Sequence, residues 1–517
     1  MTTTLPPPSC FLFALASEQK KNIMPKAKGK KRRSAGGREG KKRKPDEKMD
    51  QDEFLEPMSE DDEMVAANND GDYEVDADDE AGKAALARRI AEAEEAEGTV
   101  VRDPRRNRGA EDLECDPRAY AMLRTLNVEW PYLSFDVLED DGGDGRTVFP
   151  HSMVAVCGSQ AAEKAGNKLT LLRVDGLRKV KVDDDDSDDD DRDLDDDSDD
   201  DDEPPRATVF EVAHPGAVRR VAAASSSSRG IVATWSDDDA KIRLWDLRSE
   251  ATAYCQGNSK KPTGMHTKTV FGSVNSDAPG YALNWSKMSG VAPRLAAGDD
   301  RGTVLACSLR SEGGGLDVIA KWTSINKQSV EDVAWSPSEA TVLMAVGSDR
   351  AVKVYDTRHA TRRDPMLTRP EAHSDDINCL SWNASVSYLV ATGGDDGLIQ
   401  VWDLRAFGTA AKPVGTFDYH KSHSITSLQW DPNDESAIAV AASDDAVTLW
   451  DLSVEDEVEP PLDNKNTDDL ALPPQLLFVH QGIHDPKEVK HHPQIPGCLI
   501  TTAANGLSLF IPALQGK

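Results

Sequence analysis

The chain has 517 residues, of which 92 are acidic and 60 are basic, so its formal net charge at neutral pH is −32. This excess of carboxylates argues against a direct nucleic-acid binder, because contacts to phosphates require lysine and arginine on the binding face. No apolar run approaches the length of a membrane span, and the seven cysteines form no close pairs, which fits reduced thiols inside a cell.

Residues 1–110 are predicted to be a charged, disordered tail. Two basic clusters lie about ten residues apart between Lys26 and Lys48, in the pattern of a bipartite nuclear localisation signal. Their basic residues are Lys28, Lys30, Lys31, Arg32, Arg33, Lys41, Lys42, Arg43 and Lys44. A tail that contacts RNA nonspecifically is the alternative. The apolar run from Phe11 to Ala16 is short and lacks a basic region before it, so we do not expect a secretory signal peptide.

Residues 111–127 are predicted to form an N-terminal helix that packs on the following domain. Asp116 suits the N-cap, and Pro117 suits the first helical position. Tyr120, Leu123 and Leu126 would then share one face of this helix.

The segment from Asp183 to Glu203 contains 17 acidic residues and one arginine, and therefore carries half of the excess negative charge. We expect this segment to be a disordered insertion. Electrostatic capture of a strongly basic protein is the hypothesis, and a function in solubility is the alternative. The carboxylates assigned to capture are Asp183, Asp184, Asp185, Asp186, Asp188, Asp189, Asp190, Asp191, Asp195, Asp196, Asp197, Asp199, Asp200, Asp201, Asp202 and Glu203. Candidate sites for an acidophilic kinase are Ser59, Ser187 and Ser198.

The rest of the chain repeats one design. Trp402-Asp403 and Trp450-Asp451 lie 48 residues apart, and Tyr355-Asp356 lies 47 residues before the first pair. Each pair follows an acidic turn and a run of alternating apolar residues, which is a hairpin and strand signal. This period with Trp-Asp endings is the signature of a WD-repeat β-propeller. A second marker has the same period and consists of Trp285, Trp335, Trp382 and Trp430.

Both markers together predict an all-β fold with seven blades over residues 128–517. The first blade is assigned to Trp130–Val174, and the last blade to Phe478–Phe510, which lacks the Trp-Asp pair. The acidic insertion at 183–203 is accordingly placed between the first and second blades. His491-His492 is interpreted as the position where the mid-repeat tryptophan has been replaced.

A hydrogen-bonded tetrad is predicted inside the blades. Its members in one repeat are His373, Ser381 or Thr392, Asp396 and Trp402. Buried polar groups need partners, and the repeated spacing supplies them in each blade, so a hydrolytic triad is the weaker interpretation. The chain also lacks a glycine-rich phosphate loop, an HExxH motif and a kinase motif. We therefore expect no enzymatic activity, no metal and no cofactor.

Two separate motifs resemble the histone-binding, retinoblastoma-associated WD-repeat proteins. One is Glu129-Trp130-Pro131-Tyr132-Leu133 after the predicted helix, and the other is Pro473–Phe478 after an acidic insertion at residues 455–472. The resemblance implies a side pocket between the N-terminal helix and the acidic Pro-Pro loop, where relatives hold a core-histone helix. The residues that it assigns to this pocket are Tyr120, Leu123, Leu126, Asp468, Asp469, Pro473, Pro474, Leu477 and Phe478.

Residues 111–517 resemble more specifically the glutamate-rich WD-repeat proteins, a family that includes a yeast regulator of ribosome biogenesis. The Asp-rich insertion, Ser329–Pro337 and Leu476–Gly497 carry this resemblance. On the propeller top, Tyr281, Glu331 and Asp376 match positions that grip a basic peptide in the histone-binding relatives. Positions that depart from the histone binders are Ala217, Arg219, Pro279 and Ser424, and an ordinary blade surface remains the alternative.

These features together favour a monomeric, non-enzymatic acidic escort. The resemblance implies that it binds a basic ribosomal protein of the large subunit, of the L-three type, and promotes 60S assembly in the nucleus and nucleolus, with shuttling through the cytoplasm. A histone chaperone that acts at chromatin is the leading alternative. A substrate adaptor for a ubiquitin ligase is open to any WD-repeat propeller.

Overall fold

A computed structural model of the chain describes residues 115–181, 204–225, 228–237, 239–257, 270–310, 315–324, 326–408, 411–455 and 472–514. These residues belong to one compact unit. The predicted tail, the localisation signal, the acidic run at 183–203, the three candidate phosphorylation sites, Asp468 and Asp469 all lie outside the described residues.

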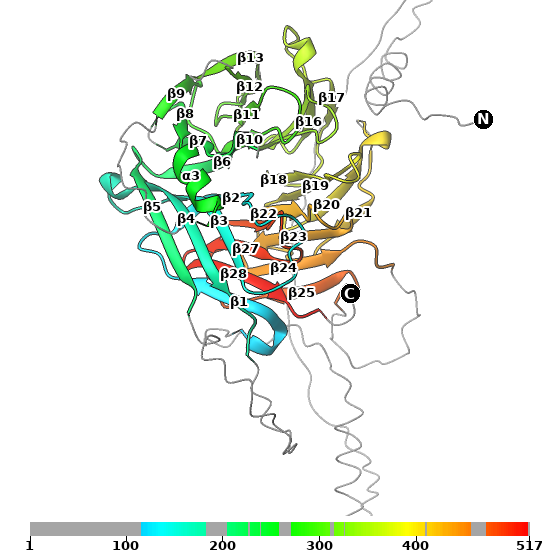
Figure 1. The fold of residues 1–517 in the computed structure, drawn as a ribbon. Helices are drawn as coiled ribbons and strands as arrows, with labels where there is room; N and C mark the ends of the chain where they lie inside the picture. Colours follow the sequence, from blue (N-terminus) through cyan, green and yellow to red (C-terminus); the bar gives the residue numbers. More distant parts are fainter. Residues whose placement is uncertain are drawn as a thin grey trace, which may run out of the picture. The chain divides into compact units, whose positions relative to one another are not determined.

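The described strands form seven four-stranded antiparallel sheets around a central channel (Figure 1), which confirms the seven-bladed propeller. Blades 1 to 3 consist of β2 (Tyr132–Leu138), β3 (His151–Ser159), β4 (Lys168–Leu177), β5 (Arg206–Ala213); β6 (Val218–Ala223), β7 (Ile231–Ser236), β8 (Lys241–Asp246), β9 (Val270–Asn275); and β10 (Ala282–Trp285), β11 (Arg294–Gly298), β12 (Thr303–Leu309), β13 (Leu316–Thr323). Blades 4 to 6 consist of β14 (Val330–Trp335), β15 (Val342–Gly347), β16 (Val352–Asp356), β17 (Leu367–Arg369); β18 (Ile377–Trp382), β19 (Leu389–Gly394), β20 (Ile399–Asp403), β21 (Gly415–Phe417); and β22 (Ile425–Trp430), β23 (Ala437–Ala442), β24 (Ala446–Asp451), β25 (Leu476–His480). Blade 7 consists of β26 (Glu488–His491), β27 (Leu499–Ala503), β28 (Gly506–Pro512) and β1 (Tyr120–Leu126).

The first strand of each of blades 1 to 6, and β26 in blade 7, faces the channel. We call the face where these inner strands begin the top face, and the opposite face the bottom face. The described helices are α3 (Arg248–Cys255) and the short 3-10 turns η2 (Pro117–Ala119), η3 (Lys164–Gly166), η6 (Thr357–His359) and η7 (Leu404–Ala406). None of the helices in the described ranges has the length and apolar character that a membrane span requires.

The acidic turns of the repeat join the second and third strands of their blades at the top face. Their third residue has a positive φ, at 57° for Arg350, 72° for Gly397 and 61° for Asp445. Glycine is required most strictly at 397, because a Cβ there would lie 2.6 Å from the carbonyl oxygen of His420. The sequence signal thus marks a real hairpin in each blade.

The apolar core of the described residues is divided into seven clusters, one between each pair of neighbouring blades. The marker tryptophans belong to these clusters, and Trp402 and Trp450 are almost completely buried. Because each blade buries both faces of its sheet against its neighbours, no blade has a complete core of its own.

The tetrad prediction is confirmed with Thr392 as the hydroxyl. His373 Nδ1 lies 2.9 Å from Asp396 Oδ1, and His373 Nε2 lies 2.8 Å from Thr392 Oγ1. The Trp402 indole N–H donates to the same oxygen at 2.9 Å. Ser381 instead accepts the backbone N–H of Trp430 at 3.2 Å. The next blade repeats the tetrad with His420, Asp444, Thr448 and Trp450.

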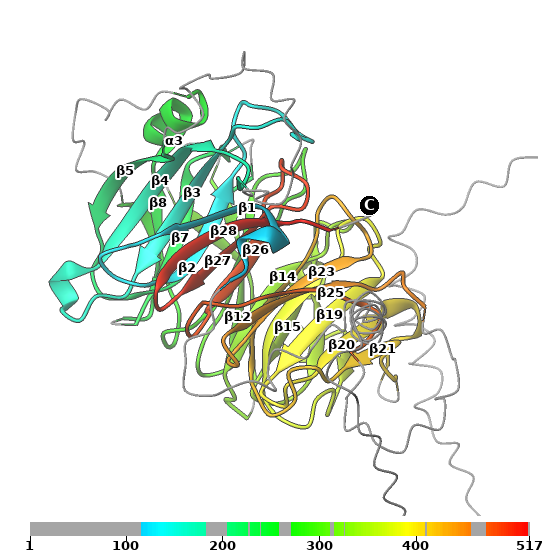
Figure 2. The ribbon, with the colours of Figure 1, turned by 90° about the horizontal axis from the view of Figure 1, so that it is seen from below.

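The prediction of a helix at residues 111–127 was wrong for its described part. Only η2 is helical there, and Tyr120–Leu126 form strand β1, which pairs antiparallel with β28 so that Leu123 lies opposite Phe510 (Figure 2). Without β1, the edge of β28 would have unpaired N–H and C=O groups, so pairing outweighs the local helix signals. The two distant ends of the described chain thereby close the ring in blade 7.

Two predicted boundaries also need correction. Phe478 lies in β25, the outer strand of blade 6, so the last blade begins at Glu488 and not at Phe478. Likewise, residues 182–203 fall between β4 and β5, inside blade 1, and not between the first and second blades. Residues 456–471 fall at the equivalent place in blade 6, between β24 and β25. Both acidic segments therefore connect a third strand to an outer strand and start from the bottom face.

Candidate partner-binding site

Hydrogen bonds join neighbouring inner strands around the channel. At six of the seven blade junctions in the described part, a side-chain oxygen on one inner strand accepts a backbone N–H from the inner strand of the next blade. The acceptors are Ser134, Asn284, Asp332, Ser381, Ser427 and Glu488. At the remaining junction the Trp285 indole N–H donates to the carbonyl of Ala222 at 3.1 Å. The channel wall is thus a fixed frame for the side chains at its two openings.

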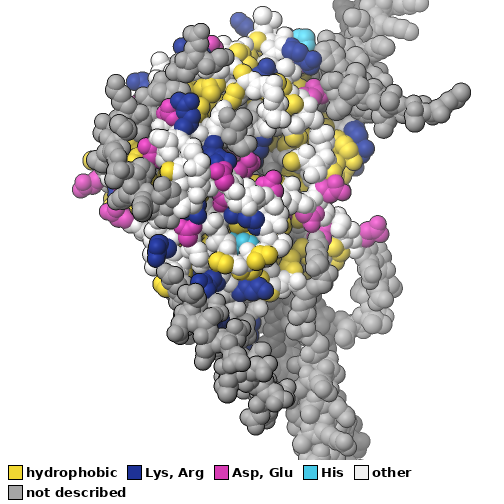
Figure 3. Space-filling view, in the orientation of Figure 1, with side chains coloured by type: hydrophobic (Ala, Val, Ile, Leu, Met, Phe, Trp, Pro, Cys, Tyr) yellow, Lys and Arg dark blue, Asp and Glu magenta, His cyan; other side chains and the backbone are white. Residues whose placement is uncertain are grey.

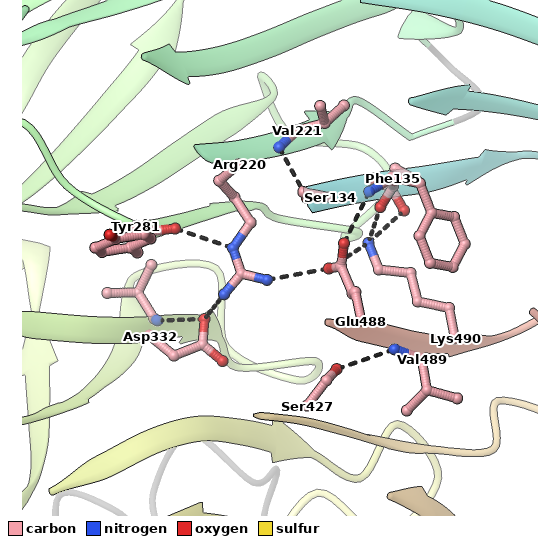
Figure 4. Close-up of polar contacts among 12 residues, drawn as sticks. Ser134, Phe135, Arg220, Val221, Tyr281, Asp332, Ser427, Glu488, Val489 and Lys490 are labelled. Atoms are coloured by element: carbon pink, nitrogen blue, oxygen red, sulfur yellow. Dashed lines mark hydrogen bonds and ion pairs between the residues drawn. The ribbon is translucent and has the colours of Figure 1, made fainter. Parts of the chain in front are cut away.

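A charge network crosses the upper part of the channel (Figure 4). Glu488 of β26 is almost completely buried and lies 3.0 Å from Nη1 of Arg220 and 3.4 Å from Nζ of Lys490. Its other oxygen accepts the backbone N–H of Phe135 at 2.8 Å. Asp332 lies 3.6 Å from Arg220, and Asp136 lies 3.1 Å from Lys490. The network therefore joins blades 1, 2, 4 and 7.

Each cation in this network has two carboxylate partners. Burial alone would lower the pKa of Arg220, but Asp332 and Glu488 outweigh it and raise that pKa. Burial opposes the charge of Lys490 in the same way, and Asp136 and Glu488 raise its pKa. Three carboxylates therefore compensate two cations, so the network positions the strands and leaves no unpaired cation for a ligand.

The top face is the first predicted binding surface. Figure 3 shows acidic and basic side chains together at the middle of the face in view. Tyr281 precedes β10 and is 41% exposed. The guanidinium of Arg219 lies 4.4 Å from the centre of the Tyr281 ring and pairs with Asp300 at 3.1 Å. Arg219 therefore covers the aromatic residue with a cation of this chain, which is consistent with its departure from the histone-binding pattern.

Glu331 is the second residue of the inner strand β14, and Asp376 immediately precedes the inner strand β18. Both lie at the top opening of the channel. Burial raises the pKa of Glu331, and the negative charges of Asp300 and Asp376 raise it further. Burial also raises the pKa of Asp376, followed by the repulsion of Asp375 and Asp395. Both pKa values are raised first by burial and then by neighbouring carboxylates, and a cationic side chain at this opening would lower them again.

The second predicted surface is the side pocket, and the structure brings part of it together. Tyr120 packs edge-on against Phe478 at 5.2 Å between ring centres, and its hydroxyl lies 2.7 Å from Nδ1 of His480. Burial raises the pKa of the Tyr120 hydroxyl. Leu123 and Leu477 are partly buried in the same cluster between blades 6 and 7.

The other residues assigned to the side pocket lie elsewhere or outside the described residues. Leu126 packs into the cluster between blades 7 and 1, because alternate residues of a strand face opposite sides. Pro473 and Pro474 line a separate groove between blades 5 and 6. The side of the propeller therefore has a small apolar cluster in which Tyr120 is buried and Leu123, Leu477 and Phe478 are partly buried, without the helix that the prediction required.

Sequence reasoning missed the charge network in the channel. Its residues alternate with apolar residues in the inner strands, as Glu488 and Lys490 do on either side of Val489. Charged residues at every second position of a strand that also carries buried apolar residues could have indicated a polar channel. The pairing itself joins residues up to 354 positions apart and has no local signal. The described residues contain no group of His, Cys, Asp or Glu that could hold a metal ion.

The fold, the repeated tetrads and the Trp-Asp strand ends define the class of this protein, which is a seven-bladed WD-repeat propeller protein. Residues 321–356, 365–403 and 411–451 match the family profile described as WD domain, G-beta repeat. Residues 110–178 match the family profile of the histone-binding protein RBBP4, which also describes a component of the CAF1 complex.

The particular family follows from full-length relatives. The chain is 38% identical over 409 residues to glutamate-rich WD repeat-containing protein 1 of Dictyostelium discoideum, covering 77% of this chain and 82% of the relative. It is 37% identical over 424 residues to the protein HEAT STRESS TOLERANT DWD 1 of Arabidopsis thaliana, covering 78% and 88%. It is 32% identical over 414 residues to ribosome assembly protein rrb1 of Schizosaccharomyces pombe, covering 77% and 82%. The chain belongs to the family of glutamate-rich WD repeat-containing proteins.

Proposed function

We propose that this protein is a non-enzymatic escort for a strongly basic ribosomal protein of the large subunit, of the L-three type, and that it promotes ribosome assembly in the nucleus and nucleolus. The observation that carries the proposal is the group of carboxylates at the top face, where burial and then the neighbouring charges of Asp300 and Asp376 raise the pKa of Glu331. The acidic run at 183–203, which connects the third and outer strands of blade 1, gives the chain further negative charge. The name of the fission-yeast relative, a ribosome assembly protein, supports the process.

The mechanism would be competitive masking. Lysine and arginine side chains of the client would pair with carboxylates of this chain, which would keep them from premature contacts with nucleic acid. Ribosomal RNA would then displace the chain, because its phosphate density gives the client more ionic contacts. The complex is accordingly expected to hold one client and to weaken as salt rises.

A histone chaperone is the second candidate, because residues 110–178 match a histone-binding family profile. Two features weigh against the same use of the two surfaces. Arg219 covers Tyr281 at the top face, and β1 replaces the predicted helix beside Phe478.

Affinity purification tests the proposal. The intact chain and a version that lacks residues 183–203 are purified at moderate salt, and the proteins that accompany each are identified. A basic large-subunit ribosomal protein should accompany the intact chain in stoichiometric amount and the shortened chain in reduced amount. Core histones without any large-subunit ribosomal protein would overturn the proposal.

Charge reversal tests the top face separately. Glu331→Lys together with Asp376→Lys should abolish client binding, while the matched control Asp317→Lys with Asp364→Lys changes the net charge equally away from the top face. If both double variants bind alike, the client does not use the top face.

A further inference from the structure

A groove at the bottom rim of the propeller, between blades 5 and 6, is separate from both surfaces discussed above. Its volume is about 740 Å³, within the range of roughly 300–1,000 Å³ typical of ligand pockets. Its apolar walls are Tyr388, Val414 and Phe417 from blade 5 and Leu452, Pro473 and Pro474 from blade 6.

Two of these apolar side chains are exposed to solvent. Val414 is 64% exposed and Tyr388 is 37% exposed, which places both among the few exposed large apolar residues of the described chain. Neighbouring exposed apolar residues that line one groove mark an interaction site more reliably than scattered ones.

Polar contacts next to the groove join its two blades and fix one of its lining residues. The Asn383 side-chain amide donates to the carbonyl of Glu435 at 2.8 Å and so joins the bottom loops of the two blades. One face of the Tyr388 ring is covered by the guanidinium of Arg405 at 3.7 Å, and Arg405 is itself paired with Asp403 at 2.6 Å. A preformed groove loses less conformational freedom when it binds.

The charge around the groove is negative. Asp418 and Glu435 line it, and no lysine or arginine does so among the described residues. Ser453 and Pro473, which also line it, flank a stretch at 455–471 with seven acidic residues and one lysine. An occupant with apolar side chains and positive charge would complement these features.

We propose that this groove binds a short segment of the basic client in which apolar side chains are flanked by lysine or arginine. The proposal rests on the escort function proposed above and assigns that function a contact at the bottom face. Salt screens the ion pairs of an exposed complex but leaves apolar burial intact. The groove would therefore retain the client at salt concentrations where the carboxylates alone release it.

Photo-crosslinking on the full chain tests the proposal. A photoreactive amino acid replaces Val414, and in a control it replaces Val318, which is 50% exposed on the outer strand of blade 3. The probe is the mixture of proteins stripped from purified large ribosomal subunits. We expect crosslinks from position 414 to one segment of one ribosomal protein, with lysine or arginine beside apolar residues, and no such product from position 318.

Affinity measurements with that ribosomal protein complete the test. At about 0.5 M salt, where exposed charges are screened within about 5 Å, Val414→Asn should weaken binding about tenfold, the equivalent of one lost apolar side chain. Val318→Asn should leave binding unchanged.

These experiments distinguish failure of the escort function from failure of the groove proposal. If the chain binds no large-subunit ribosomal protein even at low salt, the escort function itself fails. If a complex forms but position 414 crosslinks only to residues 456–471 of this chain, or Val414→Asn and Val318→Asn bind alike, the groove proposal alone is overturned.

Discussion

The substitution Glu488→Gln tests the charge network in the channel. Glutamine keeps the size of the side chain and an oxygen that can accept the backbone N–H of Phe135, but it removes the charge shared by Arg220 and Lys490. The Glu488 side chain is 5% exposed, and the loss of one partner from a buried ion pair costs about 3–5 kcal/mol. Asp332 and Asp136 still neutralise the two cations, so we expect a loss of about 2–3 kcal/mol in the free energy of unfolding.

The assay is urea unfolding of the full chain followed by tryptophan fluorescence, because the marker tryptophans lie in the clusters between blades. The matched control is Lys487→Gln, one residue earlier, whose partner Asp485 lies 2.6 Å away with both side chains well exposed. It should cost no more than about 1 kcal/mol. Combining Glu488→Gln with Arg220→Met should cost less than the two separate losses added together. Equal stability of Glu488→Gln and Lys487→Gln would refute the idea that this network fastens the blades.

Three further predictions concern the fold. Thr392→Val leaves the buried Trp402 indole N–H without an acceptor and His373 Nε2 without its hydroxyl partner, and should lower the free energy of unfolding by about 2–4 kcal/mol, whereas Thr392→Ser should cost under about 1 kcal/mol by the same urea assay. Burial lowers the pKa of His480 to about 4. The unfolded chain, with a histidine pKa of about 6.5, therefore binds the proton first, and stability should fall by about 3 kcal/mol between pH 6.5 and pH 4. His480→Gln should remove this part of the slope, although Glu331, with its raised pKa, contributes in the opposite sense. Removal of residues 1–127 deletes β1 and should make blade 7 susceptible to limited proteolysis, while removal of residues 1–114 should not.

The number of blades could be predicted from the sequence because the marker residues make the same buried contacts in successive repeats. Trp402 and Thr392 are fixed by the same hydrogen bond, so their spacing follows from the hairpin that joins β19 and β20. The outer strands carry no such marker. For this reason the sequence could not show that the acidic runs precede β5 and β25 inside their blades.

Local sequence patterns could not predict contacts between segments that are far apart in the chain. Tyr120, Leu123 and Leu126 have a helical spacing in the sequence, and the deciding partner of β1, β28, lies nearly four hundred residues away. Of the residues assigned to the side pocket, Tyr120, Leu123 and Phe478 meet between blades 6 and 7, and their function in binding stays a prediction. Leu126 was misassigned because it was placed on the face of a helix and lies on the opposite side of a strand.

The central claim is that this chain holds one basic large-subunit ribosomal protein in preference to histones. The most direct measurement is the mass and composition of the complex that the purified full chain forms when large-subunit ribosomal proteins and core histones are offered together in equal amounts, determined by size-exclusion chromatography with light scattering and mass spectrometry. The account predicts a one-to-one complex with a single ribosomal protein that dissociates when ribosomal RNA is added. A complex that contains core histones, or a mixture of many ribosomal proteins bound without selection, would contradict it.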